Sequence, residues 1–164
     1  MHETDLALLI LRVTAGITMA YHGHNKTKGL GGTAKWFESM GMRPGAIQAR
    51  LAAFTEIAAG LGMAVGFLTP LTGAAFIGLM LVAGIVAHRN NGFFIFLKDQ
   101  GWEYTMILGV IGLFVAMVGA GRYSLDRALG ITFAEWVGSA IAAGGVVGGV
   151  GLLAVSWRPN RSAS

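Results

Sequence analysis

Two ionisable residues stand inside long apolar stretches of the sequence. Arg12 interrupts the stretch from Leu6 to about Tyr21, and Glu56 interrupts the stretch from about Ile47 to Leu68. An ionisable group in a membrane-spanning helix costs about 2.5–3.5 kcal/mol on insertion scales, so it normally faces the bundle and has a partner. In antiparallel spans, Arg12 would lie about 9 Å and Glu56 about 16 Å below the same boundary, a difference that an arginine side chain bridges. We predict a buried ion pair that either fixes the helix register or forms a polar element of a cofactor or proton site.

Five polar or aromatic residues stand near the ends of three apolar stretches. His22 and Lys26 follow the first stretch, and His88 ends the third. Trp102 and Glu103 begin the fourth. We predict that these residues converge at one membrane boundary and bind a quinone head, because histidines can exchange hydrogen bonds with its carbonyls. Lys26 would add positive potential, Trp102 with neighbouring phenylalanines would form an apolar wall, and Glu103 would pass protons.

The same residues have alternatives to quinone binding, and some of these are excluded by the sequence. The histidines could simply be wetted by lipid headgroups, and a metal or haem would need a ligand spacing such as HExxH or His-x3-His, which is absent. We therefore predict no metal site. The chain has no cysteine, so it has no disulfide, thiolate or iron–sulfur chemistry of its own. Redox work would need a bound cofactor, such as a quinone, or a partner.

The composition indicates a membrane protein. Hydrophobic residues make up 54% of the 164 residues and charged residues make up 12%. That charged share is about half of the share in soluble domains. The mean hydropathy is +0.63, and 26 glycines suit membrane helices. We predict an all-α membrane protein with an antiparallel four-helix transmembrane bundle and a fifth C-terminal transmembrane helix. The spans are 6–21, 47–68, 71–88, 102–120 and 136–157. No basic-aromatic surface for nucleic acid is present.

The lysines and arginines predict the orientation. With five spans, nine of them fall on one side: Lys26, Lys28, Lys35, Arg43, Arg50, Arg89, Lys98, Arg158 and Arg161. Arg122 and Arg127 fall on the other. Cytoplasmic loops of membrane proteins carry an excess of lysine and arginine. We therefore predict that the protein lies in the bacterial inner membrane with its N-terminus outside and its C-terminus in the cytoplasm.

Two further segments, the connection over residues 29–43 and the last span, have patterns that predict how they pack. The pattern of residues 29–43 predicts a short interfacial helix that Thr33 caps and Gly41 ends, with Trp36 and Phe37 on its apolar face. The alternative is an ordered loop. The last span carries two overlapping GxxxG pairs, which allow close helix approach within the bundle or in a homo-oligomer. These are Gly144, Gly145, Gly148 and Gly149.

The ordered series of short motifs resembles the DoxX family of small bacterial membrane proteins. The matching residues are Arg12-Val13, Gly16, residues 22–26, Gly29, Gly32-Thr33, Phe37-Glu38, Gly41, Pro44-Gly45, Glu56, Gly60, Gly66, His88, residues 91–94, Glu103-Tyr104 and residues 119–126. Ala120 stands where the family often has proline between two glycines. The resemblance implies a four-span core over residues 1–127, followed by an added glycine-rich span and basic tail over 128–164.

The resemblance also implies two alternative functions. The family is named for similarity to a subunit of a thiosulfate:quinone oxidoreductase, and some actinobacterial members look like part of a membrane complex with superoxide dismutase and a sulfurtransferase. We therefore expect a membrane subunit of a quinone-linked oxidoreductase system in thiol and oxidative-stress homeostasis. The alternative is a non-catalytic scaffold that anchors soluble redox enzymes at the membrane.

Overall fold

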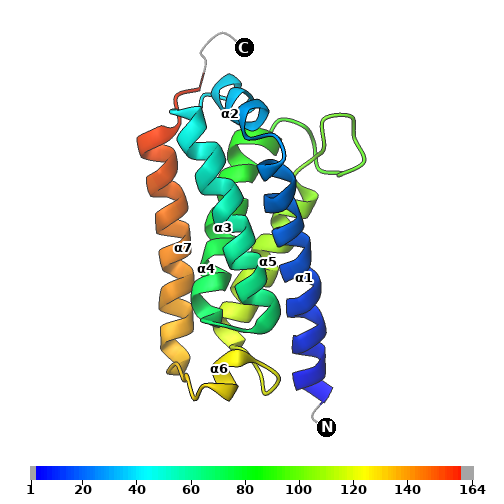
Figure 1. The fold of residues 1–164 in the computed structure, drawn as a ribbon, viewed down its shortest axis with the longest axis vertical. Coiled ribbons are helices and arrows are strands. Elements are labelled where there is room, and N and C mark those ends of the chain that lie inside the picture. Colours follow the sequence, from blue (N-terminus) through cyan, green and yellow to red (C-terminus); the bar gives the residue numbers. More distant parts are fainter. Residues whose placement is uncertain (1–2, 160–164) are drawn as a thin grey trace.

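The computed structural model describes residues 3–159, and every regular element in that range is helical. Five long helices run along the longest axis of the molecule (Figure 1). They are α1 (Glu3–Thr27), α3 (Gly45–Val65), α4 (Thr69–Ala83), α5 (Glu103–Val118) and α7 (Glu135–Ser156). The short helices α2 (Leu30–Ser39) and α6 (Leu125–Ala128) lie at opposite ends (Figure 1). The predicted all-α class is confirmed.

Three helices are long and apolar enough to cross a membrane. They are α1, α4 together with the π-helical turn η1 (Gly84–His88) that continues it, and α7. The apolar helix α5 is shorter, and α3 carries Gln48, Arg50 and Glu56. Both lie alongside the other three (Figure 1). Crossing of the bilayer by all five helices remains a prediction.

Glycine allows α1 and α3 to pack closely in antiparallel directions. A Cβ atom on Gly16 would lie 2.5 Å from the carbonyl oxygen of Gly60, and one on Gly60 would lie 2.5 Å from the amide nitrogen of Ala20. Any larger residue would push the two backbones apart. This contact fixes the register of the pair and places Gly23 of α1 beside Glu56 of α3.

The remaining long helices pack around α4. It contacts α3, lies antiparallel to α5, and carries α7 along its side. The core between α1, α3, α4 and α5 includes Met19, Met63, Phe76 and Val115, all of them almost fully buried. The helix α7 therefore lies beside this four-helix core, and a separate domain beginning at residue 128 stays a prediction.

The α2 segment is helical, as the sequence predicts, but its cap differs. Gly29 precedes the helix, and the Thr33 hydroxyl donates to the Gly29 carbonyl oxygen from inside it. Phe37 is buried, whereas Trp36 is 47% exposed. Thr33 is thus a residue of the first turn and not the cap.

Candidate functional site

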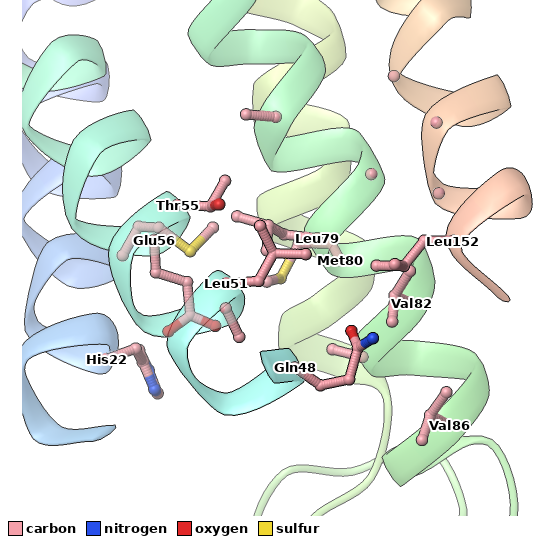
Figure 2. A pocket seen from close by; sticks show the side chains of 18 of the residues that line it. His22, Gln48, Leu51, Thr55, Glu56, Leu79, Met80, Val82, Val86 and Leu152 are labelled. Carbon is pink, nitrogen blue, oxygen red and sulfur yellow. The ribbon is translucent and has the colours of Figure 1, made fainter. Parts of the chain in front are cut away.

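An elongated cavity of about 580 Å³ follows α4 between α3 and α7. Its lining on α4 and η1 runs from Leu71 to His88. Those seventeen helical steps span about 25 Å at the usual rise per residue. Figure 2 shows side chains of α3, α4 and α7 converging on this space. Leu51 and Leu71 are 46% and 50% exposed, so the cavity reaches the surface of the bundle. Most of its wall is apolar.

The end of the cavity near α2 carries an ion pair. The Lys26 ammonium donates to both carboxylate oxygens of Glu56, at 2.7 and 2.5 Å. Their side chains are 22% and 8% exposed, and both residues line the cavity. The pair forms because the α1–α3 register brings the last turns of α1 beside the middle of α3.

Beside the ion pair, two histidines contact Tyr104 of α5. The His22 ring stacks on the Tyr104 ring at 5.8 Å between centroids and 9° between planes. The Tyr104 hydroxyl lies 3.2 Å from His88 Nε2. His88 Nδ1 lies 2.7 Å from the carbonyl oxygen of Gln100. A carbonyl oxygen only accepts, so Nδ1 carries a proton, and in the neutral ring Nε2 accepts from the Tyr104 hydroxyl.

The helix changes from α to π geometry at the end of α4, and His88 is the last residue of that π-helical turn. Residues Gly84–His88 form a single π-helical turn, a local widening that occurs frequently at functional sites. His88 itself is 7% exposed, lines the cavity and is held by the loop residue Gln100. Its imidazole is therefore fixed in orientation from both nitrogens.

The predicted ion pair between Arg12 and Glu56 is wrong. Arg12 is fully buried, as expected, but its Nη2 donates to the carbonyl oxygen of Tyr123 at 2.5 Å. Its guanidinium lies against Gly66, ten residues along the chain from Glu56. Ten residues of helix correspond to about 15 Å at the usual rise. The prediction counted the depths of Arg12 and Glu56 from the ends of their spans. It was wrong because the contact between Gly16 and Gly60 sets the register of the two helices.

Two of the predicted cofactor residues lie outside the cavity. The Glu103 carboxylate accepts from the backbone N–H of Ile95 at 3.1 Å and so holds the loop between η1 and α5. The Trp102 ring packs on Phe93 at 4.8 Å, and Phe93 also contacts Phe94. The structure thus brings together His22, Lys26 and His88 but assigns Trp102, Glu103 and the phenylalanines to the loop.

Sequence reasoning missed three polar residues of the cavity, which are Gln48, Thr55 and Tyr104. Tyr104 stands next to Glu103 in a motif that the resemblance includes, and its place two residues into the predicted span was the available signal. Gln48 donates from Nε2 to Ser156 Oγ at 2.9 Å, which ties α3 to the end of α7. Nothing in the local sequence of Gln48 indicates that distant partner.

The glycines of α7 divide into two faces. Gly145 and Gly149 pack against α4, where a Cβ atom on Gly145 would overlap the Ala74 oxygen and one on Gly149 would lie 3.1 Å from the Gly78 oxygen. A Cβ atom on Gly144 or Gly148 would meet nothing within 4 Å, and all four glycines line the cavity. One GxxxG pair is therefore used inside the chain, and a homo-oligomer contact through these glycines stays a prediction.

The site combines hydrogen-bonding groups at one end with a long apolar wall. An ammonium, a phenol hydroxyl and two imidazoles gather near α2, and the rest of the cavity offers aliphatic surface. Within residues 3–159, no three histidine or carboxylate side chains are grouped to hold a metal ion. The arrangement suits an amphipathic molecule with a polar head and an apolar tail.

Comparison with known proteins finds one matching family and two related proteins. The sequence model of the DoxX family matches residues 7–89. "Inner membrane protein YqjF" of Escherichia coli is 31% identical over 130 residues, covering 76% of this chain and 93% of the relative. "Putative oxidoreductase CatD" of Bacillus subtilis is 29% identical over 122 residues, covering 74% of this chain and 86% of the relative. No solved structure matches the chain.

Proposed function

Because this chain belongs to the DoxX family of membrane proteins, we propose that it is the membrane subunit of a quinone-linked oxidoreductase system. The observation that carries the proposal is the apolar cavity with its polar end at Lys26, His22 and Tyr104. The name of the Bacillus subtilis relative, "Putative oxidoreductase CatD", agrees with a role in an oxidoreductase system. The chain has no cysteine, so the electron donor would be a partner.

The donor set of the cavity fits a quinone. A quinone head needs hydrogen-bond donors at its carbonyls and an apolar surface for its ring, and a bound quinone would carry electrons and protons between membrane partners. Lys26 and His22 would hold the head, and the wall along α4 would accept the tail. Gly144 and Gly148 leave room for that tail because they have no side chains.

The residues around Tyr104 would hold a proton at the head. Its hydroxyl hydrogen is directed at His88 Nε2, and His88 is in turn fixed by the Gln100 carbonyl oxygen. Tyr104 and His88 both line the cavity, whereas Gln100 belongs to the loop at the α2 end. This series of contacts would place the proton between the cavity and the end of the bundle that we predict to be cytoplasmic.

Binding of a short-tailed naphthoquinone to the detergent-purified protein tests the proposal. We expect His22→Ala to weaken binding about two- to tenfold, the effect of one lost hydrogen bond. Tyr104→Phe should weaken it by a similar factor, because it removes the hydroxyl that holds His88 in orientation beside the head. Gly148→Leu should weaken it more, because it fills the tail region. Tyr21→Phe and His24→Ala are matched controls, since both residues are exposed and outside the cavity lining. Unchanged binding in all three site variants would refute the quinone site.

A second candidate function is the scaffold for soluble redox enzymes. It is supported by the exposed apolar loop at the α2 end, where Phe96 is 78% and Phe94 49% exposed. Basic residues of the same end, such as Lys28 and Lys98, would add charge. The scaffold predicts that capture of a redox enzyme is lost in Phe96→Ser but survives His22→Ala and His88→Ala. The opposite pattern would exclude it.

A further inference from the structure

A second cavity, of about 690 Å³, lies on the opposite face of α4 from the first. It is bounded by α4 with η1, by α5 and by α7. Its wall is apolar, with Ile77, Leu81 and Val110 among its residues, and small residues such as Gly109 and Ala143 widen it. On α5 its lining runs from Trp102 to Met117. That length, about 22 Å at helical rise, exceeds the half-thickness of a bilayer core, about 15 Å.

One cation stands at the end of this groove. Among the described residues of the lining, Arg89 is the only charged one, and it directly follows Thr69–His88, a segment long and apolar enough to cross a membrane. Its guanidinium carbon lies 4.8 Å from the centroid of the Trp157 ring, and the residue is exposed. No carboxylate whose side chain the structure describes forms a salt bridge with it. Trp102 and Trp157 at the same end are typical of the headgroup level.

We propose that this groove binds an anionic phospholipid, with one acyl chain along α5 and the phosphate against Arg89. A basic group at the end of a groove between membrane helices attracts anionic headgroups. The groove does not suit a quinone head, because few polar side chains besides Arg89 line it and none is a histidine, lysine or tyrosine. The Thr105 hydroxyl is already engaged, since it donates to the Trp102 carbonyl oxygen at 2.7 Å. The site is therefore distinct in chemistry from the cavity that contains Tyr104.

Lipid retention measured by native mass spectrometry tests the proposal. The purified full chain is equilibrated with phosphatidylglycerol or with phosphatidylcholine of the same acyl chains. We expect preferential retention of phosphatidylglycerol, and a loss of about fivefold in Arg89→Gln, the effect of one basic group near a membrane surface. Arg89→Lys should keep most of the retention. Lys98→Gln removes an exposed charge of the neighbouring loop, outside the groove lining, and should change nothing.

A second variant tests the acyl-chain part without touching Arg89. A Cβ atom on Gly109 would meet only Met80, at an ordinary 3.5 Å, so Gly109→Leu fills the groove from a tolerant position. It should reduce retention of both lipids and leave naphthoquinone binding intact. Equal retention of the two lipids by the wild type, or full retention in Gly109→Leu, would overturn the proposal. So would displacement of the lipid by glycerol phosphate alone, or a dimer that excludes lipid from this face.

Discussion

The ion pair between Lys26 and Glu56 is unequal in its burial. The lysine side chain is 22% exposed and lies near the end of α1, whereas the glutamate side chain is 8% exposed in the middle of α3. A lysine in such a place can extend its ammonium toward water. Removing one partner of a buried pair leaves the other uncompensated. The loss of stability should therefore depend on which partner is removed.

We predict that Lys26→Met destabilises the protein more than Glu56→Gln. The first variant leaves a carboxylate with nothing to balance it, at a cost of about 1–3 kcal/mol or more. The second leaves an ammonium that can reorient toward the headgroups. Melting temperatures in detergent would measure both, and the double variant Lys26→Met/Glu56→Gln should recover part of the loss. Equal losses, or no recovery in the double variant, would contradict this account.

Arg12 is packed against Gly66, where it leaves no room for a side chain. Gly66 ends α3 with φ +67°, and a Cβ atom there would overlap Nη1 of Arg12. In the described part of the chain, Nε and Nη1 of this fully buried guanidinium have no hydrogen-bond partner. The guanidinium therefore occupies the space that a side chain at residue 66 would need.

Gly66→Ala should destabilise the protein more than Gly130→Ala. Gly130 has the same left-handed backbone, with φ +68°, but its Cβ atom would meet nothing within 4 Å. Both variants carry the cost of a left-handed alanine, about 1–2 kcal/mol. Gly66→Ala adds an overlap worth about 1–3 kcal/mol. Thermal unfolding in detergent would show the difference, and indistinguishable melting temperatures would show that Arg12 moves freely.

At the scale of the element, the glycine-rich stretch of α7 has one pair of glycines packed against α4 and one pair with open space beside it. Gly145→Leu would insert its side chain into the backbone of α4, while Gly144→Leu would project into open space. We predict that Gly145→Leu lowers the melting temperature or the yield strongly and that Gly144→Leu does not. Gly144→Leu should instead weaken naphthoquinone binding. A melting temperature equally reduced in both variants would mean that α7 packs differently.

The extents of the helices follow from the sequence, but their register does not. Hydropathy places four of the five long helices within three residues at each end, with η1 counted as part of α4, because the apolar run itself defines each one. The exception is α1, which continues six residues beyond the predicted end at Tyr21, to Thr27. Which residues face each other depends on backbone contacts such as Gly16 with Gly60, which no local pattern encodes. Span ends therefore give Arg12 the wrong partner and leave Lys26 unrecognised as the partner of Glu56.

The gathering of three polar residues from helix ends was predictable, but the direction of the side chains that follow a loop was not. His22, Lys26 and His88 lie at helix ends, and the alternation of helix direction brings those ends together. Trp102 and Glu103 stand after a loop of irregular path, in which the Glu103 carboxylate binds the Ile95 backbone. The direction of a side chain at such a point depends on the loop conformation, which the spacing of residues does not reveal.

At the scale of the whole molecule, basic residues gather at one end of the bundle. The end of α1, α2, the start of α3, the loop after η1 and the end of α7 all lie there (Figure 1). They carry every residue of the predicted basic side within residues 3–159, whereas Arg161 falls outside the described residues. Arg122 and Arg127 lie at the opposite end, beside α6. This asymmetry supports the predicted orientation, with the basic end in the cytoplasm.

Labelling of single cysteines in intact cells tests that orientation. The chain has no cysteine of its own, so each introduced thiol gives an unambiguous signal. Lys28 and Arg127 are both exposed and lie at opposite ends. We predict that a membrane-impermeant maleimide labels Arg127→Cys in intact cells and labels Lys28→Cys only after the membrane is opened. Lys98→Cys should behave as Lys28→Cys does, because its loop lies at the same end. The reverse pattern would invert the orientation, and labelling of all three from outside would show that the two ends do not lie on opposite sides of the membrane.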